Sequence, residues 1–243
     1  MNMEKTKTGD SWEVTALRHV AYIDIMGFKD RVAKFKHEDV YATMLQINDR
    51  RIKAVGVKWT DTDIELVSTT TFSDSIMIFS KDDTPDSLYS FICTVAAFTE
   101  DLFITGVPHK GAISFGMMTL DKTNSIFFGQ PLIDAYLLQE ELEYYGVIVH
   151  AKGEEEIDKI KKLKSLLFLH PYECPLKGAA SWHLTIHPFT ACFKFKNPES
   201  EEYKDCLSLY KAVDSLKNNT SGRLRKYIDN TRKYLINVSD SYK

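Results

Sequence analysis

The chain lacks long hydrophobic runs, a signal-peptide pattern and an excess of positive charge. No stretch approaches the roughly 20 apolar residues of a membrane-spanning helix. The first ten residues, MNMEKTKTGD, are polar and contain no apolar segment of the signal-peptide type. The 31 Lys and Arg residues are outnumbered by 34 Asp and Glu residues, unlike the balance of a nucleic-acid-binding protein. We therefore expect a cytoplasmic protein that binds neither a membrane nor nucleic acid.

Closely spaced cysteines are also missing. Cys93, Cys174, Cys192 and Cys206 form no Cys-x-x-Cys motif. A chain of 243 residues can bury a core without disulfides, so we expect reduced, structural thiols. The histidines and cysteines between residues 170 and 192 match no zinc-ligand spacing.

The hydrophobic pattern alternates between strand and helix periods. Strands or strand pairs are expected at 18–26, 63–80, 110–119, 146–150, 166–169 and 181–195, and helices at 28–35, 40–52, 82–103, 130–144, 153–164 and 199–237, the last broken near 218. Up to residue 150 the order is βαββαβ, the ferredoxin-like split motif. The predicted class is therefore α+β, with added elements at the C-terminus.

We divide the chain into three parts. Residues 1–16 are expected to form a flexible tail, and residues 17–195 a single α+β domain. Residues 196–243 are expected to form a helical extension that packs on the same domain.

Two of the predicted strands each contain a lone acidic residue. Asp24 lies in AYIDIMGF and Asp74 in FSDSIMIF. The βαββαβ order places the first strand beside the hairpin, so both carboxylates can reach one edge of the sheet. Converging carboxylates repel each other unless a cation lies between them, and oxygen ligands suit Mg²⁺ or Mn²⁺. A helix cap at Asp24 and a turn contact at Asp74 are the structural alternatives.

The segment after Asp24 predicts an anion site. Residues 25–29, Ile-Met-Gly-Phe-Lys, form a strand-to-helix turn that contains a glycine. Backbone N–H groups in such a turn can bind phosphate oxygens. Reactions of nucleoside triphosphates need carboxylates that bind metal ions and, beside them, amides that bind phosphate.

These segments resemble the motifs of class III nucleotidyl cyclases. The matching segments, in family order, are Asp24–Phe28, Ser73–Phe79, Lys110–Gly116, Gly129–Tyr136 and Pro175–Gly178. Together they cover roughly residues 18–190. The resemblance implies a ferredoxin-like cyclase core and a head-to-tail homodimer with active sites at the interface.

The resemblance also implies a metal site. Asp24, Asp74 and the backbone carbonyl of Ile25 would hold two Mn²⁺ or Mg²⁺ ions. One ion would lower the pKa of the ribose 3′-hydroxyl, and the other would hold the triphosphate so that pyrophosphate leaves in line. The two aspartates would thus be the catalytic residues.

The triphosphate would contact other residues of the same motifs. The family's phosphate-binding turn corresponds to Met26, Gly27 and Phe28, and its late phosphate-binding lysine corresponds to Lys177. Lys110 is a further candidate for stabilising charge, although a lysine at the start of a strand is commonly a solvated surface residue.

Four positions depart from the pattern of purine cyclases. Thr70 replaces the base-reading lysine, and Ile126 replaces the second base-reading residue. Ile133 and Leu137 replace the asparagine and arginine that align the ribose and stabilise the transition state. The chain is thus either an inactive cyclase fold used for binding or an active branch of the cyclase family that takes another base. The presence of both aspartates favours the active branch.

The chain is also similar to the short bacterial cyclases of the Pycsar antiphage systems, in the Ala-Tyr of its fourth helix and its late Pro-Leu-Lys. This similarity implies conversion of UTP or CTP to cyclic UMP or cyclic CMP, which would activate a separate effector protein. Tyr22, Thr70 and Thr71 are the candidate residues of the base pocket. Uridylate cyclase is the leading hypothesis, ahead of cytidylate cyclase.

Other functions are compatible with parts of the pattern. A purine cyclase with unusual base contacts and a catalytically inactive binding module are the main alternatives. The βαββαβ order also occurs in RNA-binding modules, which present aromatic residues on their central strands. Here Asp24 and Asp74 occupy the candidate strands, which disfavours RNA binding.

Overall fold

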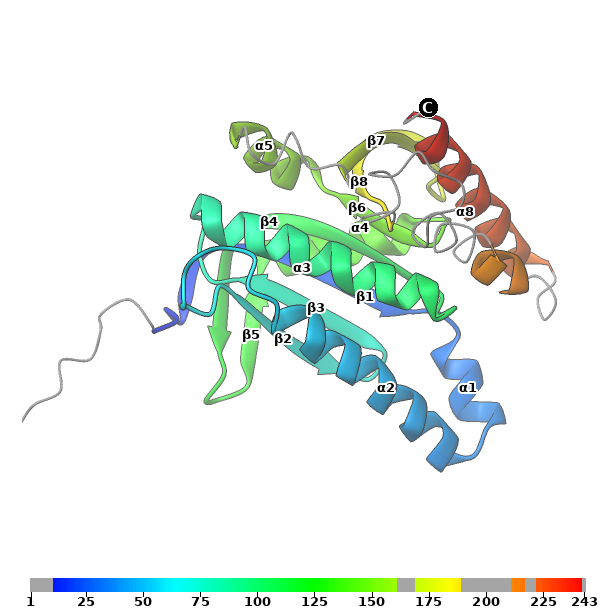
Figure 1. The fold of residues 1–243 in the computed structure, drawn as a ribbon, viewed down its shortest axis with the longest axis horizontal. Helices are drawn as coiled ribbons and strands as arrows, with labels where there is room; N and C mark the ends of the chain where they lie inside the picture. The colour runs from blue at the N-terminus through cyan, green and yellow to red at the C-terminus, as the bar shows by residue number, and fades with distance from the viewer. Residues whose placement is uncertain (1–10, 161–168, 189–210, 217–221, 242–243) are drawn as a thin grey trace, which may run out of the picture.

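A computed structural model describes residues 11–160, 169–188, 211–216 and 222–241. In that part of the chain, an eight-stranded sheet carries helices on both faces (Figure 1). The strands are β1 (Thr15–Ile25), β2 (Val67–Phe72), β3 (Ser75–Ser80), β4 (His109–Asp121), β5 (Ile126–Gly129), β6 (Gly146–Val149), β7 (Leu169–Cys174) and β8 (Ser181–Ile186). The helices are α1 (Phe28–Lys34), α2 (His37–Val55), α3 (Pro85–Ile104), α4 (Gln130–Glu141), α5 (Ala151–Lys159) and α8 (Arg223–Asp240).

β1 is a central strand of the sheet. The strand order is β2-β3-β1-β4-β6-β8-β7, and β5 pairs with β4 beside this path. β1 runs antiparallel to both β3 and β4, while β6 runs parallel to β4. The predicted α+β class with a C-terminal helix is confirmed. The close pairing of β1 with the β2–β3 hairpin positions the two aspartates described below.

Several boundaries differ from those predicted. β1 begins at Thr15, inside the predicted tail, because its first residues pair with the end of β4. β5 was not predicted, because its four residues are too few to show a strand period. The strands expected at 166–169 and 181–195 and the helices expected at 153–164 and 199–237 lie partly outside the described residues. Residues 1–10 of the predicted tail lie wholly outside them.

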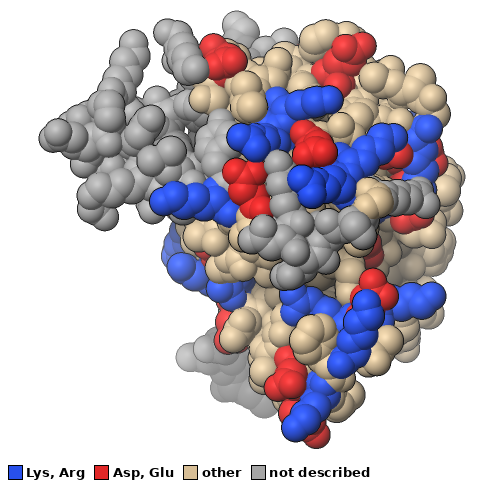
Figure 2. All heavy atoms as spheres, turned by 90° about the vertical axis from the view of Figure 1, so that its right-hand side faces the viewer, with Lys and Arg blue, Asp and Glu red and all other residues tan. Residues whose placement is uncertain are grey.

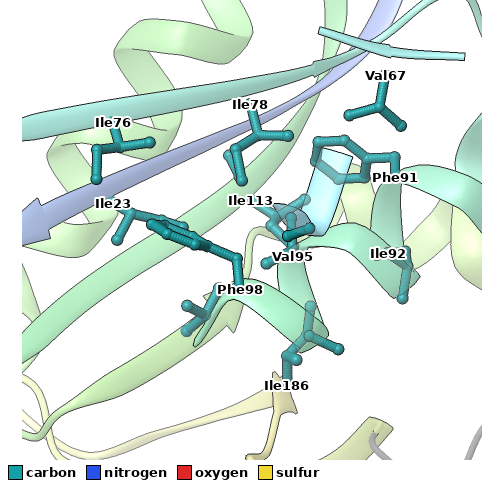
Figure 3. Close-up of a cluster of buried hydrophobic side chains, with 14 of the residues drawn as sticks. Ile23, Val67, Ile76, Ile78, Phe91, Ile92, Val95, Phe98, Ile113 and Ile186 are labelled. Atoms are coloured by element: carbon teal, nitrogen blue, oxygen red, sulfur yellow. The ribbon is translucent and has the colours of Figure 1, made fainter. Parts of the chain in front are cut away.

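One face of the sheet packs on α3. Alternate residues of the central strands point toward this helix, so that Ile23 and Ile76 meet Phe98 in the core (Figure 3). Burial of each large apolar side chain here contributes about 1.5–3 kcal/mol. By length and composition alone, α3 could cross a membrane, but most of it is buried within the protein. Thr84 caps its first turn by accepting a hydrogen bond from the N–H of Ser87.

The other face of the sheet carries α4 and α8. Tyr234 of α8 donates a hydrogen bond to Thr185 of β8 (2.9 Å), and Thr231 accepts one from the N–H of Tyr145 (2.8 Å). Apolar residues of α8, among them Ile228, complete a second buried cluster with β4 and β6. The C-terminal helix is thus packed against the same sheet, on the face opposite α3.

Two of the four cysteines lie in the described residues. Cys93 and Cys174 are buried, and neither forms a disulfide. Cys192 and Cys206 lie outside the described part of the chain. His170, four residues before Cys174, contacts Asn237 of α8 through its Nε2 (2.9 Å), a contact between β7 and α8.

His19 of β1 is buried with both ring nitrogens lacking hydrogen-bond partners among the described residues. Its ring packs against Phe115 at 4.6 Å and Phe91 at 5.9 Å between centroids. Burial lowers the pKa of His19 to about 3. Between about pH 6.5 and pH 3, His19 therefore binds a proton in the unfolded chain but not in the folded chain. The stability that is fully present above pH 6.5 is lost as the pH falls toward 3.

We predict that His19→Leu weakens this acid sensitivity. Between pH 7 and pH 5 the variant should lose about 2 kcal/mol less unfolding free energy than the wild type, measured by urea denaturation. His37→Leu, at an exposed histidine of α2, is the matched control and should behave like the wild type. Equal pH dependence of His19→Leu and the wild type would contradict the buried, neutral assignment of His19.

Candidate active site

A row of polar residues crosses the sheet near the end of β1. The register pairs Asp24 with Ser75 of β3 on one side and with Lys110 of β4 on the other. Directly paired residues place their side chains on the same face of a sheet. Because the neighbouring Ile23 belongs to the core on the α3 side, this row lies on the face that carries α4. Asp24 thus lies between a hydroxyl group and an ammonium group, at the end of β1 that leads to α1 (Figure 1).

The β2–β3 hairpin brings Asp74 to the same place. Ser73 and Asp74 form the turn between the two strands, and Ser73 has a φ of 56°. The carbonyl of Asp74 accepts a hydrogen bond from the N–H of Ile25 (3.0 Å), which attaches the turn to the end of β1. The structure therefore brings together the two aspartates that are 50 positions apart in the sequence.

Asp24 lies in an environment that disfavours its charge. The pKa of Asp24 is raised to about 6, first by burial and then by the negative charge of Asp74, while the positive charge of Lys110 opposes the rise. A cation that binds beside such a carboxylate stabilises its charged form. The arrangement therefore favours cation binding at this end of the sheet.

The donor atoms at this point are all oxygen. Asp24 and the backbone carbonyl of Ile25 lie at the end of β1, and Asp74 lies in the hairpin turn bonded to it. Mg²⁺ commonly binds through one or two carboxylates plus water and phosphate. Within the described ranges, no group of three or more His, Cys, Asp or Glu residues could hold a metal. The donor set at Asp24 and Asp74 thus fits a hard divalent cation that shares its ligands with a substrate.

The predicted phosphate-binding turn begins α1. Gly27 has a φ of 79°, in the left-handed region, and its carbonyl accepts the first helical hydrogen bond from Arg31 (3.1 Å). The N–H of Met26 donates to the carbonyl of Pro108 (2.8 Å), so it is committed to the protein. The amides of Gly27 and Phe28 are the ones in this turn that remain candidates for binding phosphate.

Lys110 and Lys177 meet at a residue that sequence reasoning missed. Glu140, near the end of α4, places Oε1 3.5 Å from the Nζ of Lys110 and Oε2 3.7 Å from the Nζ of Lys177. The N–H of Lys177 also donates to the carbonyl of Glu141 (2.9 Å), which attaches its loop to α4. The structure thus brings the late lysine and the β4 lysine to one cluster beside Asp24. In the sequence, the one sign that Glu140 faces the site is its spacing of four residues from Tyr136, because residues four apart lie on the same face of a helix.

Two of the three base-pocket candidates lie on the α4 face. The hydroxyl of Tyr22 is 2.5 Å from that of Ser75, and its ring meets the edge of Tyr136 at 5.4 Å between centroids. Thr70 pairs with Met77, which pairs with Tyr22, so these three side chains share a face. Tyr136, which the sequence did not single out as a site residue, therefore borders the same region.

Thr71 lies on the other face of the sheet. It pairs with Ile76, whose side chain is buried in the core on the α3 side. Successive residues of a strand point to opposite faces, so Thr71 cannot share a pocket with its neighbour Thr70. The structure does not bring Thr71 to the other candidate residues.

Charges of both signs are mixed on the side of the molecule that is turned toward the viewer in Figure 2. Lys and Arg side chains alternate there with Asp and Glu side chains over the described residues. A nucleic-acid-binding surface typically shows a continuous basic stripe instead.

No protein-family model and no curated protein sequence matches this chain. Among solved structures, it is similar to the catalytic core of a rhodopsin-guanylyl cyclase with converted specificity in complex with ATPαS. The TM-score is 0.50 at 13% identity, over 70% of this chain and 94% of that one. The monomeric guanylyl cyclase domain of the RhoGC fusion protein from the aquatic fungus Blastocladiella emersonii gives 0.48 at 14% identity, over 68% and 96%. A bacterial light-regulated adenylyl cyclase gives 0.46 at 14% identity, over 82% and 98%.

The first of these similarities shows the fold. The chain has the fold of a class III nucleotidyl cyclase domain, as the sequence motifs predicted.

Proposed function

We propose that this protein is a metal-dependent nucleotidyl cyclase, which converts a nucleoside triphosphate to a 3′,5′-cyclic nucleoside monophosphate and pyrophosphate. The observation that carries the proposal is the attachment of the Asp74 turn to the end of β1, which places two carboxylates together beside Lys110. The cyclase fold supports it.

The residues of the polar row have separate roles in this reaction. Asp24, Asp74 and the carbonyl of Ile25 would hold two Mn²⁺ or Mg²⁺ ions, which supply acidification of the ribose 3′-hydroxyl and neutralisation of phosphate charge. The amides of Gly27 and Phe28 bind phosphate oxygens at the start of α1.

The lysines act on the charge that develops during the reaction. Lys177 binds the phosphate chain, and its side chain is one third exposed, so it can reach a ligand. Lys110 is almost fully buried and lies opposite Asp24, where a fixed positive charge stabilises the negative charge of the leaving pyrophosphate. Both groups are positioned before substrate binds, which reduces the reorganisation that the reaction requires.

We propose a pyrimidine nucleotide as the substrate, with UTP favoured over CTP. Thr70 stands where purine cyclases carry a base-reading lysine, and it shares a face with Tyr22, whose hydroxyl can donate to or accept from a base. The product, cyclic UMP or cyclic CMP, would act as a second messenger in antiphage defence by activating a separate effector protein. A purine cyclase and an inactive binding module are the alternatives.

Incubation of the protein with Mn²⁺ and each of the four nucleoside triphosphates tests these assignments. The expected products are cyclic UMP or cyclic CMP together with pyrophosphate, identified by mass spectrometry. Cyclic AMP or cyclic GMP would support the purine alternative. An absence of product from every nucleotide would favour the binding module.

Asp74→Ala should abolish turnover while the circular dichroism spectrum and the oligomeric state stay unchanged. The reason is that the variant removes one of the two carboxylates, at a partly exposed turn, and no core group. Asp83→Ala, which removes an exposed carboxylate from the loop before α3, is the matched control and should keep full activity. Retained turnover in Asp74→Ala would refute the assignment of the metal site.

An exposed apolar surface on α4 supports a homodimer. Leu137 is 56% exposed, Ile133 is 50% exposed and Tyr136 is 44% exposed, and their spacing places them on one face of the helix. Clustered apolar side chains of this kind mark interaction surfaces. In the proposed head-to-tail dimer, each protomer would cover this surface of the other, next to the polar row beneath α4.

Leu137→Arg should convert the dimer to a monomer, because an arginine in the interface would be buried without a partner charge. Light scattering after size-exclusion chromatography measures the change, and cyclase activity should fall with it. Ile52→Arg places the same residue on the exposed apolar face of α2, on the opposite side of the sheet, and should leave the dimer intact. A monomeric wild-type protein with full activity would contradict the dimer.

A further inference from the structure

Glu140 is held by donors from three positions of the chain. Its Oε1 accepts a hydrogen bond from Nε2 of Gln139 (3.0 Å) and lies 3.5 Å from the Nζ of Lys110. Its Oε2 lies 3.7 Å from the Nζ of Lys177. None of the cyclase motifs includes this carboxylate, and the function proposed above gives it no role.

The carboxylate lies at the boundary between the interior and the surface. Gln139 is 1% exposed and donates a hydrogen bond from its side-chain amide to Glu140, whose own side chain is 42% exposed. The Lys110 side chain is 5% exposed, and a buried ammonium group needs opposite charge beside it. Asp24 supplies that charge on one side and Glu140 on the other.

Glu140 also offsets repulsion between the two lysines. The positive charge of Lys177 acts against that of Lys110, and a carboxylate between the two ammonium groups compensates both. A phosphate group offers the same anionic oxygen atoms in the same range of distances. The carboxylate and a polyphosphate would therefore compete for the same two ammonium groups.

We propose that Glu140 is an internal placeholder for phosphate: its carboxylate binds Lys110 and Lys177 in the ligand-free protein and releases them when a polyphosphate binds. The inference rests on the proposed function, because it takes the phosphate chain of the substrate as the ligand. The placeholder keeps both lysines positioned between turnovers. The Glu140 carboxylate binds both lysines again when pyrophosphate leaves. This competition lowers the affinity of the protein for pyrophosphate.

Tripolyphosphate tests the placeholder without chemistry, because it has no ribose and cannot be cyclised. Glu140→Gln keeps the shape of the side chain and an oxygen for Gln139 but removes the charge. In a low-salt Mg²⁺ buffer, calorimetry should show tripolyphosphate binding about fivefold more tightly to this variant than to the wild type, the effect of about one unit charge at 4 Å in water.

Glu141→Gln is the matched control. It makes the same charge change at the next residue of α4, whose side chain is exposed, and should leave the affinity unchanged. In a Lys177→Gln background the gain from Glu140→Gln should shrink, because one of the two competed groups is gone.

Equal or weaker tripolyphosphate binding by Glu140→Gln would overturn the placeholder, and so would an equal gain in Glu141→Gln. Tighter binding in a protein that cyclises no nucleotide would support the placeholder and refute only the proposed function. An active cyclase whose affinity for tripolyphosphate does not respond to Glu140→Gln would refute only the placeholder.

Discussion

Repulsion between two carboxylates is the constraint on which the site depends. The backbone hydrogen bond from Ile25 to Asp74 holds the hairpin turn against the end of β1, and the pairing of β1 with β3 fixes Asp24 beside it. The sheet therefore fixes the backbone at both residues. The fold keeps the two carboxylates close together, and the raised pKa of Asp24 comes first from its burial and then from the negative charge of Asp74. A divalent cation between the two carboxylates removes their repulsion, so its binding is favoured.

The parts of the fold that depend on local periodicity could be predicted from the sequence. The apolar run of residues 18–26 indicated a buried strand, and the segment 82–103, with Pro85 near its start, indicated the core helix. The meeting of Asp24 and Asp74 could also be predicted, because in a βαββαβ order the hairpin has to lie beside the first strand. Lys110 was a candidate from the cyclase motif alone, and only the pairing of β1 with β4 places it opposite Asp24.

Features that depend on register and on distant contacts could not be predicted. Thr71 was grouped with Thr70, but one step along a strand reverses the face, and only the pairing with β3 decides which residue faces the site. The amide of Met26 looked available, yet a carbonyl from the loop before β4 accepts its proton. Glu140 was not singled out from the sequence, because both lysines that contact it come from other elements.

The position of bound Mn²⁺ tests the central claim most directly. Anomalous scattering from crystals grown with Mn²⁺ and a nucleoside triphosphate analogue that cannot cyclise would locate the ion. The account predicts anomalous peaks between the carboxylates of Asp24 and Asp74, with the phosphate chain toward the start of α1. Crystals in which the analogue binds elsewhere, or in which these two side chains point away from each other with no ion between them, would contradict it.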